Sequence, residues 1–149
     1  MRFLFYDSIK EIDKGKSIIG VKSFSLTEEF LRGHYRRKAV VPGALLVETM
    51  AQLLGWLIIY SHDFNVSTFL ALAEGATVAP ALRPGFIAEI HGELISTTKR
   101  DSLGKAKMLV DGQEIASIER IIYGHIPKVN PDDLKKLFSY YSGFRREQL

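Results

Sequence analysis

The chain has 149 residues, of which 46% are apolar and 25% charged, a composition typical of one soluble globular domain with a sizeable core. It contains no cysteine, which excludes disulfides and thiolate metal sites and favours a cytoplasmic location. The formal net charge is only +3 and the basic residues are dispersed, which favours acidic partners weakly and does not fit a nucleic-acid-binding protein.

The first forty residues predict a pair of strands followed by irregular chain. Residues 3–12 mix aromatic, aliphatic and charged side chains, and residues 13–16 carry a turn signal. Residues 17–24 then read as a second strand, so the two strands form a hairpin. A short helical turn is predicted over residues 25–30, because hydroxyl caps and acidic residues stand at its start. Residues 33–41 are expected to be irregular or extended.

A helix that is apolar on nearly every side is predicted over residues 43–60, entered through Pro42. Its polar exceptions are Glu48, Thr49 and Gln52. The apolar run is about long enough to span a bilayer. An acidic residue near the centre of a membrane helix costs roughly 2.5 kcal/mol or more, so we expect a buried helix without membrane contact.

The rest of the chain is predicted to be mostly strand, followed by a terminal helix. Strands are expected over residues 68–76, 86–99, 105–110 and 113–123, with an irregular stretch over 77–82 and turns at 83–85, 101–104 and 111–112. Gly92 is a possible bulge. The terminal helix begins at Asn130 and Pro131, which form a capping signal, and can stop at Gly143.

One apolar helix with a mainly antiparallel sheet indicates an α+β architecture in which the sheet curls round the helix. We expect one domain over residues 1–124, with a linker and helix over residues 125–149 packed on it. Antiparallel edge strands often pair with a second copy of the chain, so a homodimer is expected.

The sharpest chemical signal is a histidine and a glutamate at the two ends of one loop-to-helix unit. His34 and Glu48 are fourteen residues apart, in a segment that reads Gly33-His34-Tyr35, then Pro42-Gly43, then Glu48-Thr49-Met50-Ala51-Gln52. This segment resembles the β-hydroxyacyl-acyl-carrier-protein dehydratases, a hot-dog-fold family with the pattern Gly-His-Phe-Pro, Pro-Gly and Glu-Ala-Met-Ala-Gln and the same interval. Weaker likeness extends from about residue 3 to residue 123.

The resemblance implies dehydration of a β-hydroxyacyl thioester, carried on acyl carrier protein, to the trans-2-enoyl thioester in fatty acid or related synthesis. It implies no metal or organic cofactor, and a homodimer or trimer of dimers whose subunits share the active site. His34 would be the base and Glu48 the acid, and the backbone N–H of Gly43 would bind the thioester carbonyl. Apart from the resemblance, Thr49 and Gln52 are expected either to support these groups or to serve helix packing, and Gln52 can position Glu48 from four residues along the helix.

These residue types suit the chemistry. A neutral imidazole can remove the proton alpha to the carbonyl. A glutamate in an apolar helix tends to hold a proton and can give it to the leaving hydroxyl. The helix N-terminus offers N–H groups where enolate charge develops, and the apolar remainder of the helix can line an acyl tunnel with the facing strands.

The chain departs from the family pattern after the histidine, where Tyr35-Arg36 replace Phe-Pro. We hypothesise that Arg36, Arg37 and Lys38 dock the acidic carrier protein, and the alternative is an ordinary solvated loop. Trp56 is expected in the core. His62, His91 and His125 lack metal-ligand spacing and are expected to be surface or strand residues.

Two other functions remain open. The first is a hot-dog acyl thioesterase, in which Glu48 is the base or nucleophile and His34 is less essential. The second is a non-catalytic acyl-binding subunit. Apart from these two functions, His34 could be an ordinary loop histidine, and Glu48 could be a buried structural acid paired with an arginine.

Overall fold

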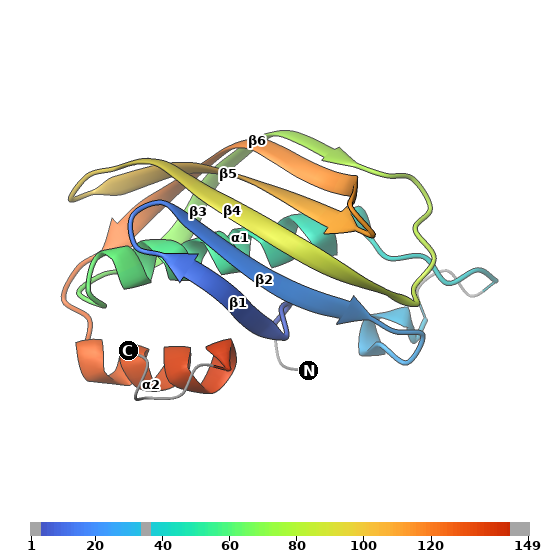
Figure 1. Ribbon diagram of the computed structural model, residues 1–149, viewed down its shortest axis with the longest axis horizontal. Helices are drawn as coiled ribbons and strands as arrows, with labels where there is room; N and C mark the ends of the chain where they lie inside the picture. The colour runs from blue at the N-terminus through green and yellow to red at the C-terminus, as the bar shows by residue number, and fades with distance from the viewer. Residues whose placement is uncertain (1–3, 34–36, 144–149) are drawn as a thin grey trace.

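The structure, a computed structural model, describes residues 4–33 and 37–143. Within these residues six antiparallel strands form one sheet in the order β1-β2-β4-β5-β6-β3, and the sheet curls round the long helix α1 (Figure 1). The elements are β1 (Ser8–Asp13), β2 (Ser17–Phe24), the 3-10 turn η1 (Glu29–Leu31), α1 (Gly43–Ser61), β3 (Ser67–Val78), β4 (Phe86–Thr97), β5 (Asp101–Val110), β6 (Gln113–Ile126) and α2 (Pro131–Ser142). The predicted α+β architecture is confirmed.

The core lies between α1 and the inner face of the sheet. The α1 side chains that reach it are fully buried: Leu46, Met50, Leu53, Leu54, Leu57 and Ile58. Among the described residues α1 alone is long and apolar enough to cross a membrane, and its burial against the sheet shows that these properties belong to a core helix.

Glycines let the sheet approach α1 closely. A Cβ added to Gly20 would lie 2.8 Å from Leu53 Cδ1, and one added to Gly104 would lie 2.7 Å from Leu54 Cδ2. The prediction of a bulge at Gly92 is wrong: this residue pairs in regular register, and the β4–β5 register shift falls between Leu94 and Ser96. A Cβ at Gly92 would contact Ile18 Cγ2 at 2.9 Å, so the residue is small to make room for packing.

The turn predicted at residues 101–104 is also misplaced, because β5 already begins at Asp101. The turn lies over Thr98–Asp101, where Thr98 Oγ1 accepts hydrogen bonds from the backbone N–H groups of Arg100 (3.0 Å) and Asp101 (3.2 Å). The predicted hairpin turn at Asp111 and Gly112 is confirmed, since both residues adopt positive φ (49° and 79°) as a type I′ turn requires.

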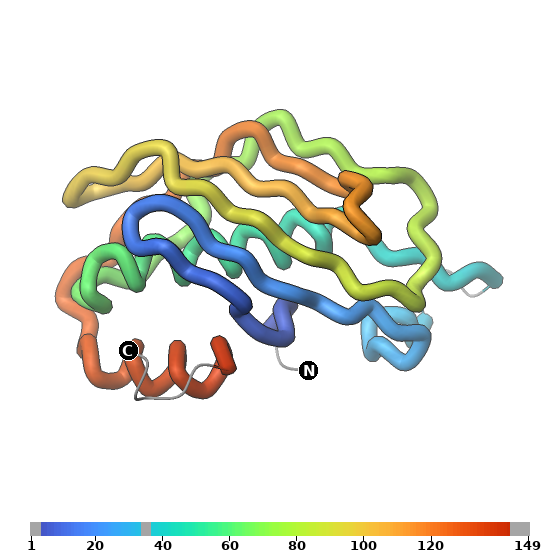
Figure 2. Tube along the Cα trace, in the orientation of Figure 1, coloured from blue at the N-terminus to red at the C-terminus, as the bar shows by residue number. Residues whose placement is uncertain are grey.

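Helix α2 packs beside the C-terminal end of α1 and near β1 (Figure 2). Asn130 caps it by accepting a hydrogen bond from the Asp132 N–H at 3.0 Å, and Gly143 ends it at φ 76°, as predicted. Phe138 is fully buried among the rings of three aromatic side chains of α1 and the following loop, with centroid distances of 5.4–5.7 Å: Trp56, Tyr60 and Phe64.

Candidate active site

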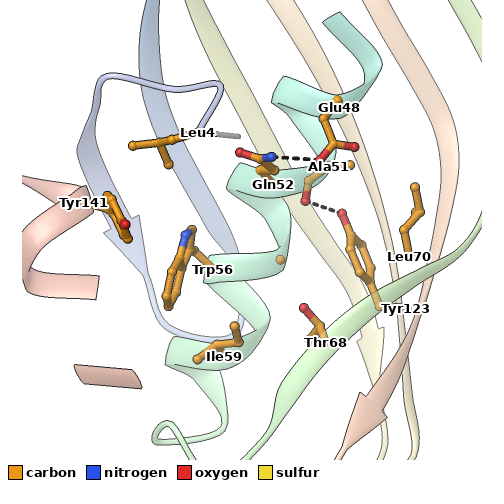
Figure 3. Close-up of a pocket in the computed structure, with 11 residues that line it drawn as sticks. Leu4, Glu48, Ala51, Gln52, Trp56, Ile59, Thr68, Leu70, Tyr123 and Tyr141 are labelled. Carbon is orange, nitrogen blue, oxygen red and sulfur yellow. Dashed lines mark hydrogen bonds between the residues drawn. The ribbon is translucent and has the colours of Figure 1, made fainter. Parts of the chain in front are cut away.

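A cavity of about 480 Å³ runs along one face of α1 (Figure 3). Six α1 residues at helical spacing contribute to it: Glu48, Ala51, Gln52, Gly55, Trp56 and Ile59. One side is completed by Thr68 and Leu70 of β3 and Tyr123 of β6, and the other by Leu4 and Tyr141 of α2. Ile59 is eleven positions beyond Glu48, about 16 Å along the helix axis, so this α1 cavity is elongated along that axis.

Glu48 lies half-buried at one end of the α1 cavity, and Gln52 holds it in place. Gln52 Nε2 donates a hydrogen bond to Glu48 Oε1 at 2.8 Å, while Gln52 Oε1 accepts one from the Phe5 N–H at 3.0 Å. Because both ends of the amide are bound, its orientation is fixed. One carboxyl oxygen of Glu48 is therefore used for positioning.

Sequence reasoning missed Tyr123, which lines the α1 cavity next to Glu48. Its hydroxyl donates a 2.6 Å hydrogen bond to the Ala51 carbonyl oxygen and so ties β6 to α1. Burial raises the pKa of this phenol well above its usual range, and the nearby charge of Glu48 adds to the shift. The hydroxyl therefore stays protonated. The alternation of buried residues along β6, which places Ile121 and Tyr123 on the inner face, was the signal available in the sequence.

Gly43 lies at the start of α1, whereas Thr49 is buried within the helix. Gly43 is the first residue of α1, after Pro42, and a Cβ added there would lie 3.3 Å from Val78 Cγ1. Its N–H belongs to the group at a helix start that has no partner within the helix. Thr49 is fully buried and donates to the Leu45 carbonyl oxygen at 2.7 Å, so it serves helix packing instead of facing the cavity.

The other predicted site residues precede α1 in the chain. His34 and Arg36 lie outside the described residues. Arg37 and Lys38 are described, and both side chains are exposed on the loop that leads to α1. Trp56, expected in the core, is half-buried and packs against the core, and it also lines the α1 cavity.

A second polar cluster lies at the far end of α1. The His62 and His125 rings are 4.8 Å apart, and a hydrogen-bonded chain joins them: His62 Nε2 to Thr97 Oγ1 (2.7 Å), Thr97 to Ser102 Oγ (2.7 Å), and Ser102 to His125 Nε2 (2.8 Å). Burial lowers the pKa of His62, the neighbouring His125 lowers it further, and Asp63 acts in the opposite direction. No group of three or more metal-ligating side chains occurs in the part of the chain that the structure describes.

The family model and the curated relatives that resemble this chain agree on one family. The model of the FabA-like domain matches residues 1–119. The 3-hydroxyacyl-acyl-carrier-protein dehydratase FabZ of Pediococcus pentosaceus is 32% identical over 117 residues, which is 78% of each chain. The FabZ of Caldicellulosiruptor bescii is 35% identical over 120 residues, covering 78% of this chain and 84% of the relative.

Solved structures agree on the fold. The dehydratase heterocomplex ApeI:P from Xenorhabdus doucetiae matches with a TM-score of 0.68 at 14% identity, over 91% of this chain and 90% of the other. Smu.793 from Streptococcus mutans, solved bound to acetyl CoA, matches with a TM-score of 0.66 at 13% identity, over 87% and 95%. The resemblance inferred from residues 33–52 is confirmed, and the chain belongs to the FabA-like family of hot-dog dehydratases.

Proposed function

We propose that this protein removes water from a β-hydroxyacyl thioester on acyl carrier protein and forms the trans-2-enoyl thioester of fatty acid synthesis. The observation that carries the proposal is the identity of 32–35% with FabZ dehydratases over most of both chains. The arrangement at Glu48 supports it, because a carboxyl group fixed by an amide at the end of an apolar cavity suits an acid that acts on a thioester.

The reaction needs one base and one acid. His34 takes the proton from the carbon alpha to the carbonyl, and Glu48 gives its proton to the β-hydroxyl as the carbon–oxygen bond breaks. Water leaves, and the electron pair of the broken C–H bond becomes the new double bond. Since Gln52 binds one Glu48 oxygen, the other faces the substrate hydroxyl.

The N-terminus of α1 stabilises the charge that develops on the thioester oxygen. The Gly43 N–H stands at the positive end of a nineteen-residue helix. Loss of one such donor typically lowers the rate about 100- to 1000-fold. The close contact with Val78 favours glycine at this position, because a Cβ there would lie 3.3 Å from Val78 Cγ1 and crowd β3.

The acyl chain extends from Glu48 along the α1 cavity. Ala51 and Gly55 are the smallest residues on this face of α1 and leave room for it. Gly55 has little space to spare, since an added Cβ would lie 3.3 Å from Thr68 Oγ1.

Strand β3 supports a homodimer. It is a twelve-residue edge strand with three exposed apolar side chains, Phe69, Leu70 and Leu72, and long apolar edges of this kind pair with another chain. In the proposed dimer, which can assemble further into a trimer of dimers, His34 of one subunit meets Glu48 of the other. A shared site predicts that mixing His34→Ala and Glu48→Gln subunits restores activity; continued inactivity of refolded mixtures would contradict it.

The exposed Arg37 and Lys38, together with Arg36, are proposed to contact the acidic carrier protein. An Arg37→Ala/Lys38→Ala variant should turn over carrier-bound substrate more slowly and leave short soluble thioesters unaffected. Equal loss on both substrates would refute the docking role.

We also propose a cytoplasmic location, which fractionation of cells that produce the tagged protein would test.

A direct assay tests the reaction. The protein is incubated with 3-hydroxybutyryl and longer carrier thioesters, with His34→Ala and Glu48→Gln as controls. Formation of the trans-enoyl product, abolished by both substitutions, is the expected result. Release of free thiol would show a thioesterase instead, and tight acyl binding without turnover would show a non-catalytic acyl-binding subunit.

A further inference from the structure

Tyr123 is joined to α1 at the turn that carries Glu48. Its hydroxyl donates a 2.6 Å hydrogen bond to the Ala51 carbonyl oxygen, although 72 residues separate the two in the chain. Ala51 lies three residues after Glu48 and one before Gln52, so the three residues share about one turn of the helix. Because Ala51 and Tyr123 are both buried, this hydrogen bond lies away from bulk water, which strengthens it.

The support behind the Tyr123 hydroxyl is rigid. Strand β6 lies inside the sheet, between β5 and β3, and Tyr123 pairs with Ser102 on one side and with Leu70 on the other. A strand that is paired on both sides belongs to the part of a protein that opens least. Gly55 lets the ring come close, since a Cβ added there would lie 3.8 Å from Tyr123 Cε1. The hydroxyl is therefore a fixed point next to α1.

The hydrogen bond is not needed to satisfy the helix backbone. The Ala51 carbonyl oxygen lies four residues before the Gly55 N–H, which is its regular donor within α1. A carbonyl oxygen has two lone pairs, so Tyr123 adds a second bond to a group that already has a partner. Loss of the hydroxyl therefore leaves the backbone satisfied and removes only the connection between β6 and this turn.

Two connections hold the turn from opposite sides of the α1 cavity (Figure 3). On one side Gln52 binds the Glu48 carboxyl and the Phe5 N–H. On the other side Tyr123 binds the Ala51 carbonyl. Burial is the main cause of the raised pKa of Tyr123, and the charge of Glu48 is the second cause. The carboxyl and the phenol therefore lie close enough to interact.

We infer that Tyr123 is a positioning residue for Glu48: by fixing the backbone of this turn to β6, it holds the proposed acid in its place beside the substrate. This inference rests on the proposed function, because it assigns a role in that same reaction. Gln52 fixes the orientation of the carboxyl, and Tyr123 fixes the helix turn that carries it. The role requires no contact between Tyr123 and the reacting atoms, so loss of the hydroxyl should lower kcat and leave KM nearly unchanged.

The test is steady-state dehydration of 3-hydroxybutyryl carrier thioester by Tyr123→Phe. A misplacement of about 1 Å can cost about 100-fold in rate, and Gln52 still holds the carboxyl, so we expect kcat to fall about tenfold. The urea midpoint of unfolding should change little, because the Ala51 carbonyl keeps its helical partner. Full kcat in folded Tyr123→Phe would refute the inference, and so would a rise in KM with kcat unchanged.

Ser61→Ala is the matched control, since Ser61 also connects an α1 carbonyl with the sheet. Its Oγ donates to the Leu57 carbonyl oxygen at 2.6 Å and accepts from the Gly15 N–H at 2.8 Å. Ser61 is thirteen positions beyond Glu48, about 20 Å along the helix axis, so its loss should leave kcat unchanged. An equal fall of kcat in the two variants would show a general loosening of α1 and would refute a specific role of Tyr123.

Two synthetic amino acids at position 123 separate the hydrogen bond from the ring. The para-fluorophenylalanine side chain fills the volume of the hydroxyl without donating, and para-aminophenylalanine keeps an N–H donor at that place. We expect kcat to be retained with the amino group and lowered with fluorine. Equal kcat in the two proteins would refute the inference. The fluorinated protein also replaces Tyr123→Phe if that variant does not fold.

A measurement without turnover separates this inference from the proposed function. In protein labelled with carbon-13 at the glutamate carboxyl groups, the NMR signal of Glu48 is identified by its loss in Glu48→Gln. Tyr123→Phe should shift or broaden this signal, and Ser61→Ala should not. If the unmodified protein dehydrates no thioester, the proposed function fails. The Glu48 signal then still decides the positioning: a change confined to Tyr123→Phe supports it, and an unmoved signal refutes it.

Discussion

Replacement of Gln52 by alanine should reduce catalysis more than stability. The substitution removes the 2.8 Å hydrogen bond to Glu48 Oε1 and the 3.0 Å bond from the Phe5 N–H. A typical intramolecular hydrogen bond contributes about 1 kcal/mol, so loss of both should lower the free energy of unfolding by about 2 kcal/mol. Because Glu48 then loses its fixed orientation, we expect kcat to fall about 100-fold, which is the typical cost of a small misplacement of a reacting group.

The assay is steady-state dehydration of 3-hydroxybutyryl thioester, with urea unfolding in parallel. KM should change little, since the substrate contacts along the α1 cavity remain. Gln52→Glu provides the diagnostic comparison, because two neighbouring carboxyl groups share one proton and the pH profile of kcat should change shape. An unmoved profile would show that Glu48 does not titrate in the rate-limiting reaction. If Gln52→Ala retains full kcat while folded, Gln52 does not position Glu48.

Three further outcomes follow from the packing, the polar cluster and the sheet edge. Phe138→Ala should lower the free energy of unfolding by about 3–5 kcal/mol, because it empties a fully buried aromatic position; a urea titration that shows no loss would contradict the anchoring of α2. The pKa of folded His62 lies below its ordinary value of 6.5, so the unfolded chain binds more protons than the folded protein and stability is lost as pH falls through 6.5. Tm should therefore drop between pH 8 and pH 5.5, and it should drop less in His62→Gln. Equal drops in the two proteins would exclude His62 as the cause. Leu72→Lys places a charge on the β3 edge and should yield a smaller particle by light scattering, whereas an unchanged mass would rule out dimerisation through this edge.

Local patterns were sufficient for the elements whose signals lie within a few residues. The apolar run from Gly43 predicted α1 to within one residue of its end, and the Asn130 cap predicted the start of α2. The turn at Asp111 and Gly112 was equally local. In each case the backbone geometry is dictated by the residues that adopt it.

Long-range contacts account for the errors. The first strand was expected from residue 3 but begins at Ser8, since the Gln52 side chain binds the Phe5 N–H and draws that segment towards α1. Trp56 was expected in the core and does pack against it; its contact with Phe138, 82 residues further along the chain, and its place beside the cavity depend on long-range packing. Tyr123 was missed since its partner, the Ala51 carbonyl, is identified only once β6 and α1 are in contact.

The glycines of the sheet determine how α1 is rotated about its own axis. Gly20 faces Leu53, and Gly104 faces Leu54, so each leucine side chain packs into the space left by the missing side chain of a glycine. With α1 in this rotation, Glu48 and Gln52 line the cavity. A single methyl group added at Gly104, on a strand that does not line the α1 cavity, would lie 2.7 Å from Leu54 Cδ2 and should therefore shift α1 together with the proposed acid Glu48. If Gly104→Ala loses activity, the cause would be a shift in the orientation of α1, since Gly104 itself has no chemical role in the reaction.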